Sequence, residues 1–295
     1  MRQNTGKKRK RPRAFCLPSK AKHAILCRMR ASYAFVTAAL AAMEHTPNRA
    51  LGQNFCIDGD RLQRCVDALG LSGDPVIEIG PGLGGLTELL LEKSDRVVAV
   101  EKDAAMAAYL SESMRDPKLT VLRGDALRFD YASCGTPFSV VGNLPYYITT
   151  PIAERVLQSR PRVFGCMVQK EAAERFFAAP KEDNYGALSV VTQLYYTGKP
   201  LDTFAEPCFY PAPNVQSVFV RLWERKDAPS EPIGRVFAFA RACLAMRRKT
   251  LKNNLKSVPN GLNALKLCGV SPETRAETLT PEQFLALYRA LGTEA

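Results

Sequence analysis

The sequence predicts an α/β fold in which a Rossmann-like, doubly wound sheet is followed by a small all-helical C-terminal domain. Short apolar runs alternate with helix-like segments between residues 58 and 170, which indicates parallel strands with helices on both faces of one sheet. The first of these runs leads into a glycine-rich turn at residues 80–85 that opens a helix, an arrangement typical of nucleotide sites. After residue 233, apolar residues recur at helical spacing only.

Five strands are expected in the sheet. They cover residues 75–79, 96–101, 119–122, 138–141 and 163–170. Helices are expected at residues 58–69, at 85–91, from 103 onward and at 149–157. Asp58 suits the N-cap of the first helix and Gly70 its end. Because ligands bind at the carboxyl ends of parallel strands, the residues that follow each strand are the candidate site.

The remaining chain is expected to be helical apart from an alternating run at residues 216–223. The expected helices cover residues 185–196, 236–246, 249–255, 262–267 and 281–291. Thr280 is placed to cap the last of them. Residues 224–232 are charged and contain prolines, so we interpret them as a linker between a Rossmann-like domain at 47–223 and a helical domain at 233–295.

Residues 1–46 are expected to be a basic extension, disordered or at most loosely helical. Residues 1–43 contain eleven lysines and arginines and no acid, so the rest of the chain carries a net charge of only +1. A segment of this composition cannot bury a core unaided. Three interpretations stay open: a nucleic-acid-binding arm, a targeting segment, or an upstream extension with Met29 and Met43 as alternative starts.

Composition excludes several classes of function. The nine cysteines include no Cys-x-x-Cys pair, which argues against a disulfide framework and against a zinc site, so no metal is expected. No apolar run reaches the roughly 18 residues of a membrane span. Both histidines, His23 and His45, precede the motifs, so a histidine base in the folded body is excluded. Many hydrolases and metalloenzymes are thereby excluded as candidate functions.

Chemically distinctive residues follow three of the strands. Gly80, Gly82 and Gly85 have the spacing Gly-x-Gly-x-x-Gly, and Glu101 ends the next strand, about 20 residues further on, where a carboxylate would meet ribose hydroxyls. Asp125 follows the third strand, where it would lie near an adenine amine. The glycine spacing alone also fits a dinucleotide dehydrogenase. Such an enzyme would be expected to have an acid–base residue such as histidine in its substrate half. It is disfavoured because no histidine follows the glycine turn.

The fourth strand ends in Gly-Asn-Leu-Pro-Tyr-Tyr at residues 142–147, which we interpret as the floor of a pocket. Asn143 offers a side-chain oxygen, and Leu144 precedes a proline, so its extended backbone turns its carbonyl into the same space. Tyr146 offers a ring face for stacking. These groups suit a nucleobase amine, whereas an ordinary strand-to-helix turn is the alternative from this stretch alone.

Taken together, these motifs resemble the ribosomal RNA small-subunit adenine dimethyltransferase family. The motifs are Gly-Gln-Asn-Phe at 52–55, Glu-Ile-Gly-Pro-Gly-Leu-Gly at 78–84, Val-Glu at 100–101, Gly-Asp-Ala at 124–126, Asn-Leu-Pro-Tyr at 143–146, Met-Val-Gln-Lys-Glu-Ala-Ala-Glu-Arg at 167–175 and Phe-Tyr-Pro-Ala-Pro at 209–213. They occur in the order of the family, and the resemblance covers roughly residues 48–291.

The resemblance implies S-adenosylmethionine as methyl donor, without a metal. The donor contacts that it implies are Asn54, Cys56, Gly80, Glu101, Asp125 and Asn143. Cys56 stands where the family usually has leucine, which matters little if the contact is made through the backbone. Asn143 and the Leu144 carbonyl would hold the amine of a flipped adenine, with Tyr146 as one stacking surface. By resemblance Phe209 would be the other, while a packed loop aromatic is the alternative.

A basic run in the expected helical domain is the candidate for contact with RNA phosphates. Its members are Arg241, Arg247, Arg248, Lys249, Lys252 and Lys256. We expect a monomer that dimethylates two adjacent adenines of small-subunit rRNA in the pre-30S particle, in bacterial cytoplasm or, as the minor alternative, in an organelle. Two further functions stay open on this scaffold: a large-subunit rRNA methyltransferase of the macrolide-resistance type, and a ribosome-assembly or transcription factor.

Overall fold

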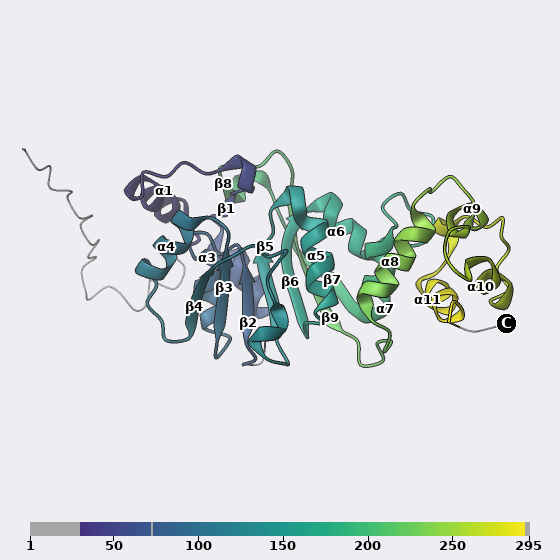
Figure 1. Ribbon diagram of the computed structural model, residues 1–295. Coiled ribbons are helices and arrows are strands. Elements are labelled where there is room, and N and C mark those ends of the chain that lie inside the picture. The colour runs from purple at the N-terminus through teal and green to yellow at the C-terminus, as the bar shows by residue number, and fades with distance from the viewer. Residues whose placement is uncertain (1–29, 72, 293–295) are drawn as a thin grey trace, which may run out of the picture.

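The computed structural model describes residues 30–71 and 73–292 of the chain, and Figure 1 shows its elements. A seven-stranded sheet has the order β4-β3-β2-β5-β6-β9-β7. Its strands are β2 (Val76–Ile79), β3 (Val97–Glu101), β4 (Leu119–Arg123), β5 (Ser139–Asn143), β6 (Val163–Gln169), β7 (Tyr196–Phe204) and β9 (Ser217–Glu224). The five strands expected from the sequence are confirmed, and they pair in parallel.

The edge of the sheet beyond β6 differs from a purely parallel sheet. Strand β9 is antiparallel to both β6 and β7. The chain therefore forms the edge strand β7 first and then returns as β9, which lies between β6 and β7. The alternating run at 216–223 corresponds to β9, whereas β7 was not expected. Strand β7 carries Gly198, Lys199 and Pro200 and has a bulge between Pro200 and Asp202, features of an edge strand that hide its periodicity.

Helices cover both faces of the sheet. Those of the sheet region are α2 (Gly59–Asp67), α3 (Gly85–Leu91), α4 (Ala104–Ser113), α5 (Thr149–Gln158), α6 (Lys170–Phe177) and α7 (Ala187–Tyr195). Val97 packs in one apolar cluster with residues of α2 and α3, while the next residue, Val98, packs in another with residues of α5 and α7. Successive strand residues thus point to opposite covered faces, which confirms the doubly wound arrangement.

Four helices form the far end of the molecule in Figure 1: α8 (Ile233–Leu244), α9 (Leu251–Leu255), α10 (Gly261–Leu267) and α11 (Pro281–Ala290). Thr280 caps α11 as expected, in a capping box with Gln283. The apolar cluster that contains Val98 continues into these helices, where it includes Phe237 and Phe284. The helical end therefore shares a core with one face of the sheet.

The stretch interpreted as a linker, residues 224–232, makes ion pairs and a hydrogen bond in the structure. Arg225 pairs with Asp227 at 2.8 Å, and Glu231 pairs with Arg289 of α11 at 2.6 Å. The Tyr195 hydroxyl donates to the backbone carbonyl of Glu231 at 2.9 Å. The domain boundaries stay a prediction.

The expected basic extension contains an ordered helix, α1 (Tyr33–Ala42), which differs from the expectation of disorder. Residues 1–29 lie outside the described part of the chain. In α1 the side chains of Val36, Ala39 and Leu40 are buried against Leu83 and Met106. Within residues 30–46 the expectation of disorder was wrong because the basic residues that dominate the composition precede the helix, whereas the helix itself is apolar. No described helix is long and apolar enough to cross a membrane.

Short elements complete the fold. A two-stranded ladder pairs β1 (Phe55–Cys56) with β8 (Phe209–Tyr210) and so joins the two loops that flank the carboxyl edge of the sheet. The 3-10 turns are η2 (Arg49–Leu51), η3 (Tyr131–Cys134), η4 (Tyr146–Ile148), η5 (Glu206–Cys208) and η6 (Ala276–Thr278).

Candidate active site

One pocket lies at the carboxyl ends of β2 to β5, closed on one side by residues 51–58, which we call the opening loop. All six residues predicted to contact a methyl donor line this pocket. They are Asn54, Cys56, Gly80, Glu101, Asp125 and Asn143. Residues far apart in sequence meet here because parallel strands end at the same edge of a sheet.

The glycine turn after β2 brings backbone close to this pocket. Gly80, Gly82 and Gly84 have φ angles of 66°, 53° and 87°, which favour glycine. A Cβ added to Gly82 would lie 2.9 Å from the Phe55 ring. A side chain here would therefore displace the opening loop from the turn.

Glu101 is held in place by two backbone donors. One carboxylate oxygen accepts from the Gly82 N–H at 3.0 Å and the other from the Asp103 N–H at 2.8 Å. Burial raises the pKa of Glu101, and these two backbone hydrogen bonds oppose the rise. Each carboxylate oxygen keeps a further lone pair, so the group is able to accept from two vicinal hydroxyls.

Asp125 presents an ionised carboxylate at the other end of the pocket. Its Oδ1 accepts from the Leu127 N–H at 3.0 Å, and its Oδ2 lies 3.0 Å from the Lys102 ammonium. The Leu127 hydrogen bond first, and then Lys102, lower the pKa of Asp125. An ionised carboxylate only accepts hydrogen bonds, so it selects for a donor such as an exocyclic amine.

The Asn143 amide is oriented by the opening loop. Its Nδ2 donates to the backbone carbonyl of Asn54 at 2.9 Å, which leaves Oδ1 as the acceptor of this pocket-lining side chain. The next residue, Leu144, has a buried side chain, and its N–H donates to the Met167 carbonyl at 3.0 Å. The Asn143 side chain and the backbone that follows it are thus each fixed by a neighbouring segment.

The two predicted stacking aromatics do not line the pocket. Tyr146 is partly buried and its hydroxyl is 2.7 Å from Ser217 Oγ. Phe209 is only 2% exposed and packs against Phe204, so its ring offers no free face for a base in this structure. The physical reason is the β1–β8 ladder, which places Phe209 in the core. Tyr147, which was not predicted, lines the pocket and is 55% exposed.

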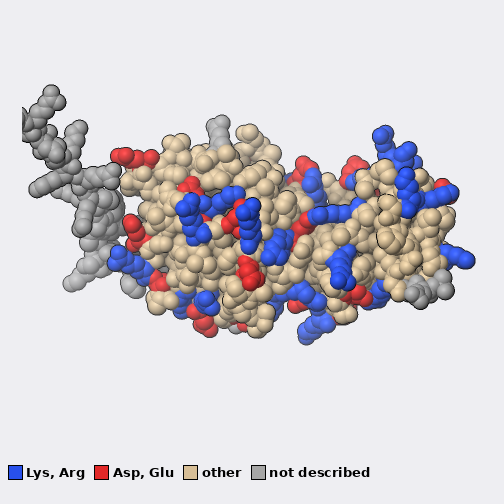
Figure 2. All heavy atoms as spheres, viewed as in Figure 1, with Lys and Arg blue, Asp and Glu red and all other residues tan. Residues whose placement is uncertain are grey.

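The six predicted RNA-binding residues divide into two groups. Arg241 pairs with Glu154, and Arg247 pairs with Glu277 at 3.4 Å and donates to the carbonyls of Glu182 and Asp183. These two side chains therefore join parts of the fold. The other four are exposed and form no ion pair within residues 30–71 and 73–292: Arg248, Lys249, Lys252 and Lys256. Figure 2 shows basic side chains projecting from this helical end.

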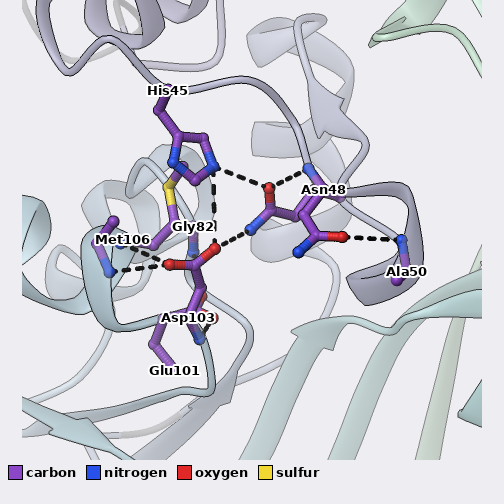
Figure 3. A network of polar contacts seen from close by, with 9 residues as sticks. His45, Asn48, Ala50, Gly82, Glu101, Asp103 and Met106 are labelled. Atoms are coloured by element: carbon purple, nitrogen blue, oxygen red, sulfur yellow. Dashed lines mark hydrogen bonds and ion pairs between the residues drawn. The ribbon is translucent and has the colours of Figure 1, made fainter.

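His45 also lies beside the site, which corrects the exclusion of histidine from the folded body. Its Nε2 is 3.3 Å from Gln53 Oε1, and Gln53 belongs to the opening loop. Figure 3 shows the His45 ring directed towards the Asp103 carboxylate. The exclusion was wrong because it assumed that a residue that precedes the motifs in the sequence also lies far from them in space. Helix α1 turns back over the sheet edge, and nothing in the local sequence signals that return.

Glu78 was also missed as a feature of the site. It is fully buried on β2, two residues before Gly80, and neither carboxylate oxygen has a hydrogen-bond partner among the described residues. Burial raises the pKa of Glu78 to about 8; the nearby Thr87 hydroxyl opposes this rise and the Glu101 charge adds to it. The carboxyl is therefore largely protonated at neutral pH.

Comparisons with known proteins agree with this geometry. Residues 44–292 match the family model described as ribosomal RNA adenine dimethylase. The chain is 43% identical over 255 residues to a protein named ribosomal RNA small subunit methyltransferase A from Myxococcus xanthus, covering 82% of this chain and 89% of that one. A protein of the same name from Deinococcus radiodurans is 40% identical over 268 residues, covering 88% and 91%.

Two solved structures have the same fold. A dimethyladenosine transferase from Plasmodium falciparum superposes with a TM-score of 0.64 at 25% identity, covering 77% of this chain and 93% of that one. The 23S rRNA methyltransferase ErmE superposes with a TM-score of 0.60 at 26% identity, covering 81% and 100%.

Proposed function

Because the chain belongs to the ribosomal RNA adenine dimethylase family, we propose that it dimethylates the exocyclic amines of two adjacent adenines in small-subunit rRNA, with S-adenosylmethionine as donor. The observation that carries this proposal is the Asn143 amide, held by the Asn54 carbonyl with its oxygen left as an acceptor in the pocket that Glu101 and Asp125 also line.

The residues present fit the donor. Gly80 and Gly82 supply a backbone that no side chain obstructs, Glu101 would accept from the ribose hydroxyls, and Asp125 would accept from the adenine amine. The neutral Cys56 thiol, whose pKa burial raises to about 12, would form part of the wall. S-adenosylmethionine supplies an electrophilic methyl group, so the protein's own contribution is to position the acceptor.

An adenine amine is a poor nucleophile because its lone pair is delocalised into the ring. Asn143 Oδ1 and the Leu144 carbonyl would accept its two hydrogens and turn the lone pair towards the methyl group. Positioning of this kind contributes much of the rate in reactions without a strong base. The proton becomes acidic once the nitrogen is alkylated and leaves to solvent. In the second transfer the amine has one hydrogen fewer to bind.

The target adenine must leave its stack to reach this pocket. Tyr146 remains our candidate for a stacking surface, although its hydroxyl is bound to Ser217. A role for Phe209 would require its ring to leave the core, so we retain it only as part of the loop beside the opening loop. Arg248, Lys249, Lys252 and Lys256 would contact phosphates without reading sequence, whereas Arg241 and Arg247 would act structurally.

The substrate class follows from the relatives. Two named for the small subunit are 43% and 40% identical, whereas the 23S enzyme is 26% identical, which favours the small subunit. That substrate would place the protein with pre-30S particles in the bacterial cytoplasm, and we propose that it acts there as a monomer. The donor-site residues that it retains favour an enzyme over an assembly or transcription factor.

The proposal is tested by incubating the purified protein and S-adenosylmethionine with small subunits that lack the modification. Nucleosides from the rRNA are then separated and identified by mass. We expect dimethyladenosine in the small-subunit rRNA and none in large subunits treated identically. Unmodified small-subunit rRNA after full incubation would contradict the proposal.

A further inference from the structure

The stretch before the opening loop reaches across the donor pocket. Resting on the donor-dependent function proposed above, we infer that residues 30–46, which we call the N-terminal strap, complete the methyl-donor site, and that His45 is a positioning residue within it. Residues 30–43 precede the range matched by the family model.

One end of the strap is fixed against the glycine turn. The Arg30 guanidinium donates to the Leu83 carbonyl at 3.0 Å and to the Ser113 carbonyl at 2.8 Å. A Cβ added to Gly85 would lie 3.3 Å from the Cβ of Ala31, so the backbones approach closely here. Arg30 therefore joins the turn after β2 to the end of α4.

The middle of the strap forms a wall of the pocket. Val36 is 1% exposed, packs with Leu83 and Met106, and lines the same pocket as the predicted donor residues. Arg30 lines it as well. Removing this wall would expose apolar surface and open the side of the pocket next to the glycine turn.

At the other end of the strap lies a network of hydrogen bonds in which each donor and each acceptor can be assigned (Figure 3). Gln53 Oε1 accepts from the backbone N–H of Asn48 at 2.7 Å, and Gln53 Nε2 donates to Asp103 Oδ2 at 2.8 Å. Because a backbone N–H only donates and a carboxylate only accepts, the amide has one orientation. His45 Nε2, 3.3 Å from Gln53 Oε1, must then carry the proton.

From Gln53 the contacts continue to the reacting groups. Its neighbour Asn54 accepts from the Asn143 amide at 2.9 Å, and its partner Asp103 donates through its N–H to Glu101 at 2.8 Å. Asp103 Oδ1 also caps α4 by accepting from Ala105 N–H at 2.8 Å. His45 thus holds the loop that orients both the predicted ribose carboxylate and the predicted catalytic amide.

The test uses the full chain and titration calorimetry with S-adenosylmethionine. We expect His45→Ala to weaken donor binding by about 3- to 10-fold, as loss of one hydrogen bond does. His45→Asn, which keeps an N–H donor, is expected to recover part of the loss. Glu44→Gln changes the exposed neighbour and is expected to bind as the parent does.

A second pair of variants tests the other end. Arg30→Ala is expected to weaken donor binding by about 3- to 10-fold, while Arg115→Ala, a change at an exposed arginine, leaves it unchanged. Melting temperatures are measured in parallel, because a merely structural role would lower the melting temperature without changing the donor affinity of the folded protein. Parental donor affinity in both His45→Ala and Arg30→Ala would overturn the inference.

The two levels of proposal fail differently. A parent protein that binds the donor but leaves small-subunit rRNA unmethylated contradicts the proposed function while the strap variants still report on the donor site. A parent protein that does not bind the donor contradicts both.

Discussion

The donor pocket and the helical end hold their polar side chains in opposite ways. In the pocket, Glu101 accepts from two backbone N–H groups and Asn143 is fixed by a backbone carbonyl. At the helical end, exposed residues such as Lys252 and Lys256 form no ion pair among the described residues. Transfer of a methyl group requires fixed geometry, whereas contact with phosphates requires charge within reach. Substitutions should therefore change catalysis sharply in the pocket and RNA affinity gradually at the helical end.

The largest effect is expected from Asn143→Ala. The variant loses the oriented acceptor, so we expect the single-turnover methylation rate to fall by about 100-fold or more, with RNA binding retained. Asn184→Ala is the control, since it removes a partly exposed amide whose hydrogen bond to Glu174 lies outside the pocket. Equal methylation rates for Asn143→Ala and the parent would remove Asn143 from the reaction.

Glu101→Gln is expected to weaken donor binding by about 10- to 100-fold. The carboxylate now accepts from two backbone N–H groups, at 2.8 and 3.0 Å. In the variant the NH2 group of the amide would face one of these N–H groups, so two donors would oppose each other. Titration with S-adenosylmethionine measures the change. Glu112→Gln, at an exposed site on α4, is the matched control, and a variant that binds like this control would separate Glu101 from the donor.

Glu78 predicts a pH dependence of stability. Its pKa is about 8 in the folded protein and near 4.5 when unfolded, so between these values the folded state keeps a proton that the unfolded state has lost. The contribution of Glu78 to stability should therefore be greatest below this window and fall as pH rises through it, by at most about 1.4 kcal/mol per pH unit.

Denaturant unfolding at several pH values between about 5 and 8 measures this slope. In Glu78→Gln the contribution should disappear, leaving a flatter profile. An unchanged profile in the variant would mean that another group is responsible.

The smallest effect per residue is expected at the helical end. Changing Arg248, Lys249, Lys252 and Lys256 together to Gln should weaken RNA binding by about 10-fold and reduce its salt dependence, with little change in donor affinity. The control changes four exposed basic residues of the sheet region to Gln: Arg96, Arg115, Arg123 and Lys199. Equal losses of RNA affinity in both variants would mean that total charge, and not this surface, binds RNA.

The contrast between pocket and surface also explains what the sequence could predict. Gly80 and Asp125 follow a strand, and Glu101 and Asn143 end one, so local patterns located them. The parallel sheet brings all four to one edge. The burial of Phe209 could not be predicted, because it depends on pairing with Cys56, more than 150 residues earlier in the chain. Local sequence carries no record of such a pairing.

The same limit applies to charge and to the N-terminal segment. Arg241 and Arg248 have the same side chain in one basic run, yet among the described residues only the first pairs with an acid, Glu154. His45 joins the site because α1 buries Val36 against Leu83 and turns the chain back. Tertiary packing decided each case, whereas residue type alone was ambiguous.

The central claim is that the strand ends form a methyl-donor pocket with Asn143 beside the transferred group. A crystal structure of the full chain with S-adenosylmethionine tests it most directly. We expect the ribose at Glu101, the adenine amine at Asp125 and the methyl group next to Asn143 Oδ1. A donor bound elsewhere, or bound here with its methyl group directed away from Asn143, would contradict the account.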